Sequence, residues 1–178
     1  MINTTDWQML LFVCMKIQRR IMKRPSEIAV PEVTFGIVPP KGYLAITWFG
    51  KIVINKKNKE YWEKYPDILK NKTINHERIH IRQAEKTHNS WFCFYCKYIW
   101  VWLKAFVLSG FKNSIAYYCN PFEVEAYLNE TNRFYQLKLF DFYQKIPVSV
   151  YIALYKSSKS FSDFLKQIVK YIEKEFNE

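Results

Sequence analysis

The chain has 178 residues, of which 49% are hydrophobic and only 4 are glycine. This composition predicts a single folded domain over 1–178 with a sizeable core, and it excludes a largely disordered or low-complexity chain. The formal net charge is +11, but the lysines are spread along the chain without a zinc-finger, helix-turn-helix or RNA-recognition pattern. Nucleic acid is therefore not an expected partner.

The first segment has an apolar run, Met9–Met15, whose positive charges follow it, from Lys16 to Arg24. A secretory signal peptide has its positive charges before the apolar run. We therefore expect no signal peptide, and a location in the cytoplasm or at the periphery of a membrane. The basic residues 16–24 are a candidate contact for an anionic membrane surface. Four prolines between 25 and 42 then predict an extended segment.

Residues 43–55 are expected to form a β-hairpin. Two stretches rich in β-branched and aromatic residues, 43–48 and 51–54, flank Gly50 as the turn. An exposed edge strand can bind an extended peptide through main-chain hydrogen bonds. The alternative is that the hairpin only covers the next helix, and the sequence does not say which strand lies at the edge.

The pattern His76-Glu77-Arg78-Ile79-His80 follows on a predicted helix over 74–88, with Thr73 as its N-cap. Residues four apart on a helix are about 6 Å apart, so both imidazoles can point at one metal ion. Glu77 lies about 100° around the helix, which suits a general base that takes a proton from water. The alternative is a solvated amphipathic helix that carries two histidines.

Residues 91–111 form an aromatic, apolar stretch that predicts a helix about 30 Å long. That length can span a bilayer, but Lys97 and Lys104 lie inside the stretch and each costs roughly 3 kcal/mol near a membrane centre. Three interpretations remain open: a partly buried helix that packs on the domain, a helix that lies in a membrane interface, and a membrane span.

A catalytic zinc ion needs a third protein ligand besides the two histidines. His88 lies too far along the helix axis to complete a tetrahedron. A second helix is predicted to begin after Asn120, an N-cap, with Pro121 in its first position, and it carries Glu123. Glu123 is the chosen ligand, although it could also complete a capping box. Glu125 and Glu130 are fallback ligands.

A histidine pair of this spacing, followed on a second helix by Glu-x-x-Ala, resembles the gluzincin metallopeptidases, and most closely the CAAX-prenyl endopeptidase, HtpX and BlaR-type families. The resemblance covers roughly residues 43–130. It implies a zincin-like core there, with Glu123 as the third zinc ligand and Ala126 as a small residue that permits close helix packing. These families usually have an aspartate next, where this chain has Tyr127.

A C-terminal helical extension over about 131–178 is expected to end the domain. Its last helix begins near Ser160, with Asp163 in a capping pattern. Apolar residues recur along it with a helical period, which favours packing on the domain over membrane binding. The apolar positions are Phe161, Phe164, Leu165, Ile168, Ile172 and Phe176.

Together these features predict an α+β, mainly α, minimal zincin-like domain with a small antiparallel sheet or hairpin. The predicted function is hydrolysis of a peptide or protein substrate by Zn²⁺ held at His76, His80 and Glu123, with Glu77 as the base. The oxyanion needs a second electrophile, for which the candidates are Tyr117, Tyr118, Tyr127 and His88. The alternative function is a catalytically silent binding or sensing protein on the same scaffold, at a membrane surface.

Overall fold

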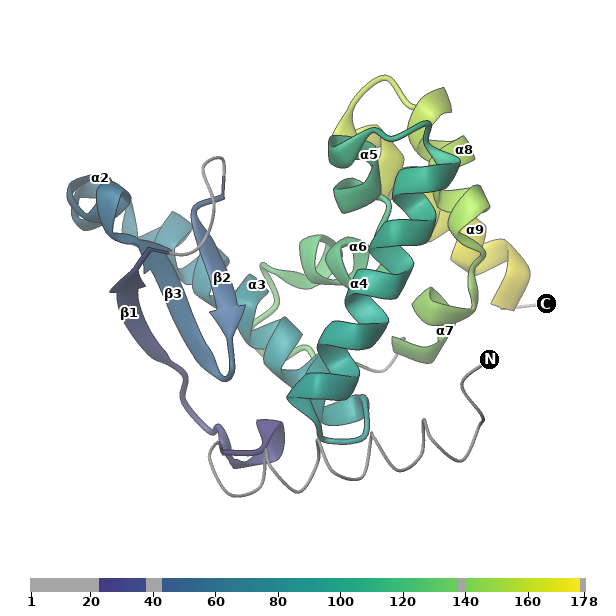
Figure 1. The fold of residues 1–178 in the computed structure, drawn as a ribbon. Coiled ribbons are helices and arrows are strands. Elements are labelled where there is room, and N and C mark those ends of the chain that lie inside the picture. The colour runs from purple at the N-terminus through teal and green to yellow at the C-terminus, as the bar shows by residue number, and fades with distance from the viewer. Residues whose placement is uncertain (1–22, 38–42, 138–139, 177–178) are drawn as a thin grey trace. The chain divides into compact units, whose positions relative to one another are not determined.

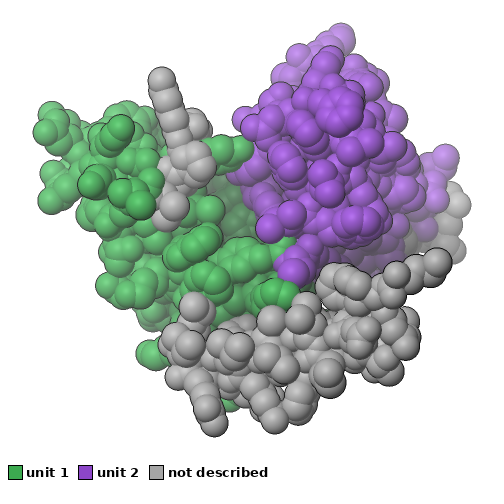
Figure 2. Space-filling model, in the orientation of Figure 1, with its two compact units in different colours: residues 1–95, 130–134 green, residues 96–129, 135–178 purple. Residues whose placement is uncertain are grey.

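The computed structural model describes residues 23–37, 43–137 and 140–176 (Figure 1). The chain is mainly helical with a small three-stranded sheet, so the predicted α+β, mainly α fold class is confirmed. The apolar run 9–15 and most of the basic segment 16–24 lie outside the described residues. The chain divides into two compact units (Figure 2), residues 1–95 with 130–134 and residues 96–129 with 135–178. The single-domain organisation stays a prediction.

The first unit contains the sheet and the helix that carries the histidine pair. Its elements are η1 (Pro25–Glu27), β1 (Glu32–Gly36), β2 (Ala45–Trp48), β3 (Lys51–Asn55), η2 (Lys56–Asn58), α2 (Lys59–Lys64) and α3 (Asp67–Lys86). Strand β3 is central and the most buried of the three, because its Ile52 and Ile54 have no exposed surface. The helix α3 contacts β2 (Figure 1).

The sheet has the order β1-β3-β2, with β2 at one edge. The predicted hairpin is confirmed: β2 and β3 pair antiparallel, and the turn residues Phe49 and Gly50 have φ of 48° and 85°, which suits a tight hairpin turn. The sheet is mixed rather than wholly antiparallel, because β1 pairs parallel with β3. Strand β1 belongs to the segment 25–42 and lies between Pro31 and Pro39. None of its residues is proline, so each has the backbone N–H group that strand pairing requires.

The histidine helix α3 begins earlier than predicted. Thr73 is not its N-cap, since the helix starts at Asp67, directly after Pro66, whose φ of −56° suits a helix start. Thr73 therefore lies inside the helix. Its apolar residues Ile81 and Ala84 are both buried. The helix ends at Lys86, so His88 lies beyond it, with a left-handed φ of 56°.

The second unit contains helices and no strand among its described residues. It contains most of α4 (Trp91–Leu108), with α5 (Asn113–Tyr118), α6 (Pro121–Asn129), α7 (Phe140–Lys145), α8 (Val148–Ser157) and α9 (Phe161–Phe176). Its core joins α5, α6, α8 and α9 through side chains that include Cys119, Val124, Tyr151 and Phe164. The predicted start of α9 near Ser160 is confirmed, because the helix begins at Phe161 and the Ser160 hydroxyl accepts a hydrogen bond from Asp163 N (3.1 Å).

The aromatic stretch forms α4, which buries one face and exposes another. Trp91, Phe94 and Ala105 are buried, while Ile99, Trp100 and Val107 are each more than half exposed. By length and composition α4 could cross a membrane, and within the described residues it alone meets that criterion, with 17% of its residues buried. The structure therefore excludes a helix that is buried on every side.

Candidate metal centre

Helix α3 presents His76 and His80 on one face, as their spacing predicts. Both side chains are buried, and their ring centroids lie 5.0 Å apart with the rings nearly perpendicular. Two imidazoles one helical turn apart can therefore share a single ion.

One ring nitrogen of each histidine contacts an oxygen acceptor. His76 Nδ1 lies 3.2 Å from Glu130 Oε2, and His80 Nδ1 lies 2.8 Å from the Gln83 side-chain oxygen Oε1. Because a carboxylate and an amide oxygen only accept, each Nδ1 carries the proton and donates it. The lone pair that a metal needs is then on Nε2 of both rings.

Glu130 is itself held in place by α3. Lys72 Nζ lies 2.9 Å from Glu130 Oε1, and the Asn75 side-chain amide donates to the backbone oxygens of Glu130 (2.8 Å) and Asn132 (3.1 Å). The carboxylate that orients His76 therefore comes from Glu130 rather than from position 127. Sequence reasoning named Glu130 only as a fallback ligand. Glu130 follows Tyr127 by three residues, about one helical turn. This spacing could have indicated that Glu130 orients His76 in place of the aspartate expected at position 127.

Glu77, the predicted base, is buried and hydrogen-bonded to β2. The Thr47 hydroxyl lies 2.8 Å from Glu77 Oε2 and 2.9 Å from the Glu77 backbone oxygen, where it can donate. The Tyr95 hydroxyl donates to Thr47 O (3.0 Å) and accepts from Phe49 N (3.1 Å). Burial, reinforced by the charge of Glu77, raises the pKa of Tyr95 to about 12. Tyr95 therefore stays a neutral donor that fixes the strand beside Glu77.

Glu123 lies in the first turn of α6, and its helix begins as the sequence predicts. The Asn120 side-chain oxygen accepts from Phe122 N (3.2 Å), and Pro121 occupies the first helical position. The Glu123 carboxylate is buried and accepts a hydrogen bond of 2.6 Å from the Tyr98 hydroxyl on α4. A short bond from a hydroxyl to a carboxylate is strong, so Tyr98 orients this side chain.

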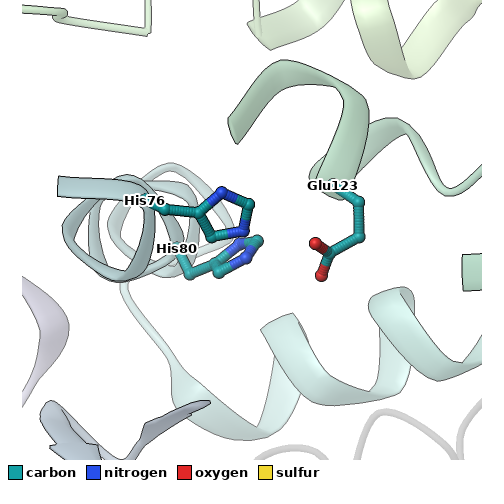
Figure 3. A group of neighbouring side chains, drawn as sticks. All are labelled: His76, His80 and Glu123. Carbon is teal, nitrogen blue, oxygen red and sulfur yellow. The ribbon is translucent and has the colours of Figure 1, made fainter. Parts of the chain in front are cut away.

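His76, His80 and Glu123 form a buried group that could hold a metal ion (Figure 3). One ligand atom from each residue lies within 4.8 Å of the other two. Two imidazole nitrogens and one carboxylate oxygen form a donor set that zinc accepts.

The candidate oxyanion stabilisers differ in their surroundings. The hydroxyls of Tyr117 and Tyr127 lie 3.4 Å apart. Burial, with the charge of Glu123 as the next cause, raises the pKa of Tyr117 well above its usual range. The ring of Tyr118 instead packs against Tyr155 and Phe161.

The last oxyanion candidate, His88, and the fallback metal ligand Glu125 have other surroundings. His88 is exposed beyond the end of α3. The fallback ligand Glu125 is fully buried and accepts a 2.8 Å hydrogen bond from the Tyr135 hydroxyl. Glu125 therefore belongs to a polar pair with Tyr135, which agrees with the expectation that Glu123 and Glu125 face different ways on one helix.

Comparisons with protein-family models, with curated proteins and with solved structures found no match.

Proposed function

We propose that this protein is a zinc-dependent metallopeptidase that hydrolyses peptide bonds in a peptide or protein substrate. The observation that supports this proposal is the buried group of His76, His80 and Glu123, whose donor atoms suit zinc. The same helix carries Glu77, a buried carboxylate that Thr47 orients. A metal-ligand set with an adjacent oriented carboxylate is the arrangement that metal-assisted hydrolysis requires.

When bound, a zinc ion would supply Lewis-acid chemistry, which acidifies a water molecule and polarises a carbonyl group. Glu77 acts as general base toward that water and afterwards delivers the proton to the amine leaving group. The Thr47 hydroxyl holds Glu77 Oε2 in one orientation. Glu130 and Gln83 keep the histidine rings in the tautomer with the proton on Nδ1.

The position of β2 supports an extended peptide as the substrate. This strand lies at an edge of the sheet and contacts α3, and Thr47, which binds Glu77, is one of its residues. A peptide that adds to this edge as a further strand would lie beside the catalytic helix.

A hollow of about 700 Å³ at the Trp48 end of β2 favours apolar substrate side chains. Its lining includes Ile28, Val30, Trp48 and Phe49, and its charges are balanced between two lysines and two glutamates. We expect Trp48→Ala to raise KM for substrates with a large apolar residue. Tyr61→Ala, at an exposed tyrosine on α2, is the control that should leave KM unchanged.

The first test is the metal content of the purified protein by elemental analysis. We expect one zinc per chain, lost in His80→Ala and in Glu123→Ala. His88→Ala, at an exposed histidine outside the group, is the control that should keep the metal. A protein that takes up no zinc even after reconstitution would contradict the proposal.

The second test is cleavage of an unfolded protein such as casein by the zinc-loaded protein. We expect Glu77→Gln to keep its zinc and lose cleavage, because an amide cannot accept the proton. Stable zinc binding without turnover on diverse unfolded proteins would instead favour the catalytically silent scaffold.

A further inference from the structure

Helix α4 exposes a continuous apolar stripe. Ile99, Leu103 and Val107 are each four residues apart, so they lie on one face of the helix, and they are 58%, 42% and 53% exposed. Trp100 lies next to this row and is 57% exposed. Phe111, which follows the helix end, is 70% exposed. Large apolar side chains that gather on one exposed face mark an interaction surface.

The charged residues of the sequence segment that carries this stripe all have the same sign. Between Trp91 and Asn120 the sequence has three lysines, Lys97, Lys104 and Lys112, and neither aspartate nor glutamate. All three lysines are exposed. Lys104 Nζ lies 5.0 Å from the ring centroid of Trp100, so one edge of the stripe carries a cation over an indole. A stripe of this kind complements a surface that is apolar inside and negatively charged outside.

The buried face of α4 limits how the helix can bind a membrane surface. Trp91, Phe94 and Ala105 are buried within the protein, so lipid cannot surround the helix. Lys97 and Lys104 lie inside the apolar segment, where each would be costly at a bilayer centre. A helix that lies in the plane of the interface lets the lysine side chains extend to the headgroups while the apolar stripe enters the acyl region.

We propose that the α4 stripe, defined by Ile99, Trp100, Leu103 and Val107, binds the surface of an anionic lipid bilayer and holds the protein at the membrane. The binding depends on apolar insertion of the stripe and on Lys97 and Lys104 at its edge. It does not depend on the metal centre, so its test is independent of the proposed peptidase activity.

The experiment is co-sedimentation of the full chain with vesicles of equal parts phosphatidylcholine and phosphatidylserine, and with vesicles of phosphatidylcholine alone. We expect binding to the anionic vesicles that weakens as salt rises. The double variant Leu103→Glu/Val107→Glu should bind roughly tenfold more weakly or worse. Lys97→Gln and Lys104→Gln should each weaken binding by roughly fivefold.

Two controls separate the stripe from general effects of charge and folding. Ile68→Glu places one such negative charge at an apolar residue of α3 that is 77% exposed, and should bind nearly as the unmodified protein does. Circular dichroism should show the same helix content in all variants. The chain has six tryptophans, and a blue shift of fluorescence on vesicle addition that Trp100→Phe reduces would place the stripe in the lipid.

Three results would overturn the proposal. The first is absence of binding to the anionic vesicles. The second is binding that Leu103→Glu/Val107→Glu leaves unchanged. The third is a dimer in solution that this double variant dissociates while vesicle binding persists, because the stripe would then be covered by a second copy of the chain.

Discussion

The hydroxyl of Thr47 lies 2.8 Å from the carboxylate oxygen Oε2 of Glu77, so the edge strand β2 and the histidine helix α3 meet at the proposed catalytic base. Both side chains are buried. The Tyr95 hydroxyl donates to the carbonyl oxygen of the same Thr47. The orientation of Glu77 therefore depends on residues that are distant from it in the sequence.

We expect Thr47→Val to lower kcat by roughly ten- to a hundredfold, because Glu77 loses the hydrogen bond that orients it. Zinc content and KM should change little, since Thr47 is not in the metal-binding group. Thr47→Ser keeps the hydroxyl and should restore most of the rate. A rate that is equal in the valine and serine variants would show that the hydroxyl has no positioning role.

Glu130→Ala should weaken zinc binding by about ten- to a hundredfold, because His76 loses the acceptor that holds its ring. The backbone of Glu130 stays tethered, since Asn75 bonds its carbonyl oxygen. Competition with a chromogenic chelator measures the affinity. Glu63→Ala, at an exposed glutamate paired with Lys59, is the matched control. Unchanged zinc affinity in Glu130→Ala would exclude a role for this carboxylate.

Tyr117→Phe should lower kcat with little change in KM if its hydroxyl stabilises the oxyanion. The raised pKa of Tyr117, caused first by burial, keeps the hydroxyl protonated at neutral pH, so that it can donate. Tyr118→Phe should have little effect, because that ring packs against Tyr155 and Phe161. Steady-state kinetics on a peptide substrate decide between the tyrosines, and a larger loss in Tyr118→Phe would reverse the assignment.

The buried tyrosines predict a loss of stability in alkali. Burial, and then the charge of Glu125, raise the pKa of Tyr143 from 10.0 to about 12 in the folded protein. The stabilisation is present in full below pH 10, where the tyrosine is neutral in both states, and it is lost as the pH rises through about 12. A pKa difference of this size corresponds to roughly 3 kcal/mol of folding free energy.

In Tyr143→Phe the free energy of unfolding should therefore fall less steeply above pH 10 than in the unmodified protein. Denaturation with urea at a series of alkaline pH values measures this slope. Equal slopes in Tyr143→Phe and in the unmodified protein would mean that Tyr143 ionises alike in the folded and unfolded states.

The amino-acid sequence was sufficient for those features that depend on local geometry. The histidine spacing placed two imidazoles on one face of α3, and the Asn120-Pro121 pair set the start of α6. The turn at Gly50 and the period of apolar residues in α9 were also readable, because hydrogen bonds within a few residues determine turns and helix ends. The mainly helical fold class followed from these elements.

Tertiary structure decided the features that depend on contacts between distant segments. Thr47 and Tyr95 reach the surroundings of Glu77, and Glu130 reaches His76, across separations that no local pattern encodes. The start of α3 at Asp67 rather than after Thr73 shows that a cap residue gives a preference that packing and a nearby proline override. Composition alone also could not predict that one face of α4 is exposed, because apolar side chains suit a protein core and a lipid surface equally well.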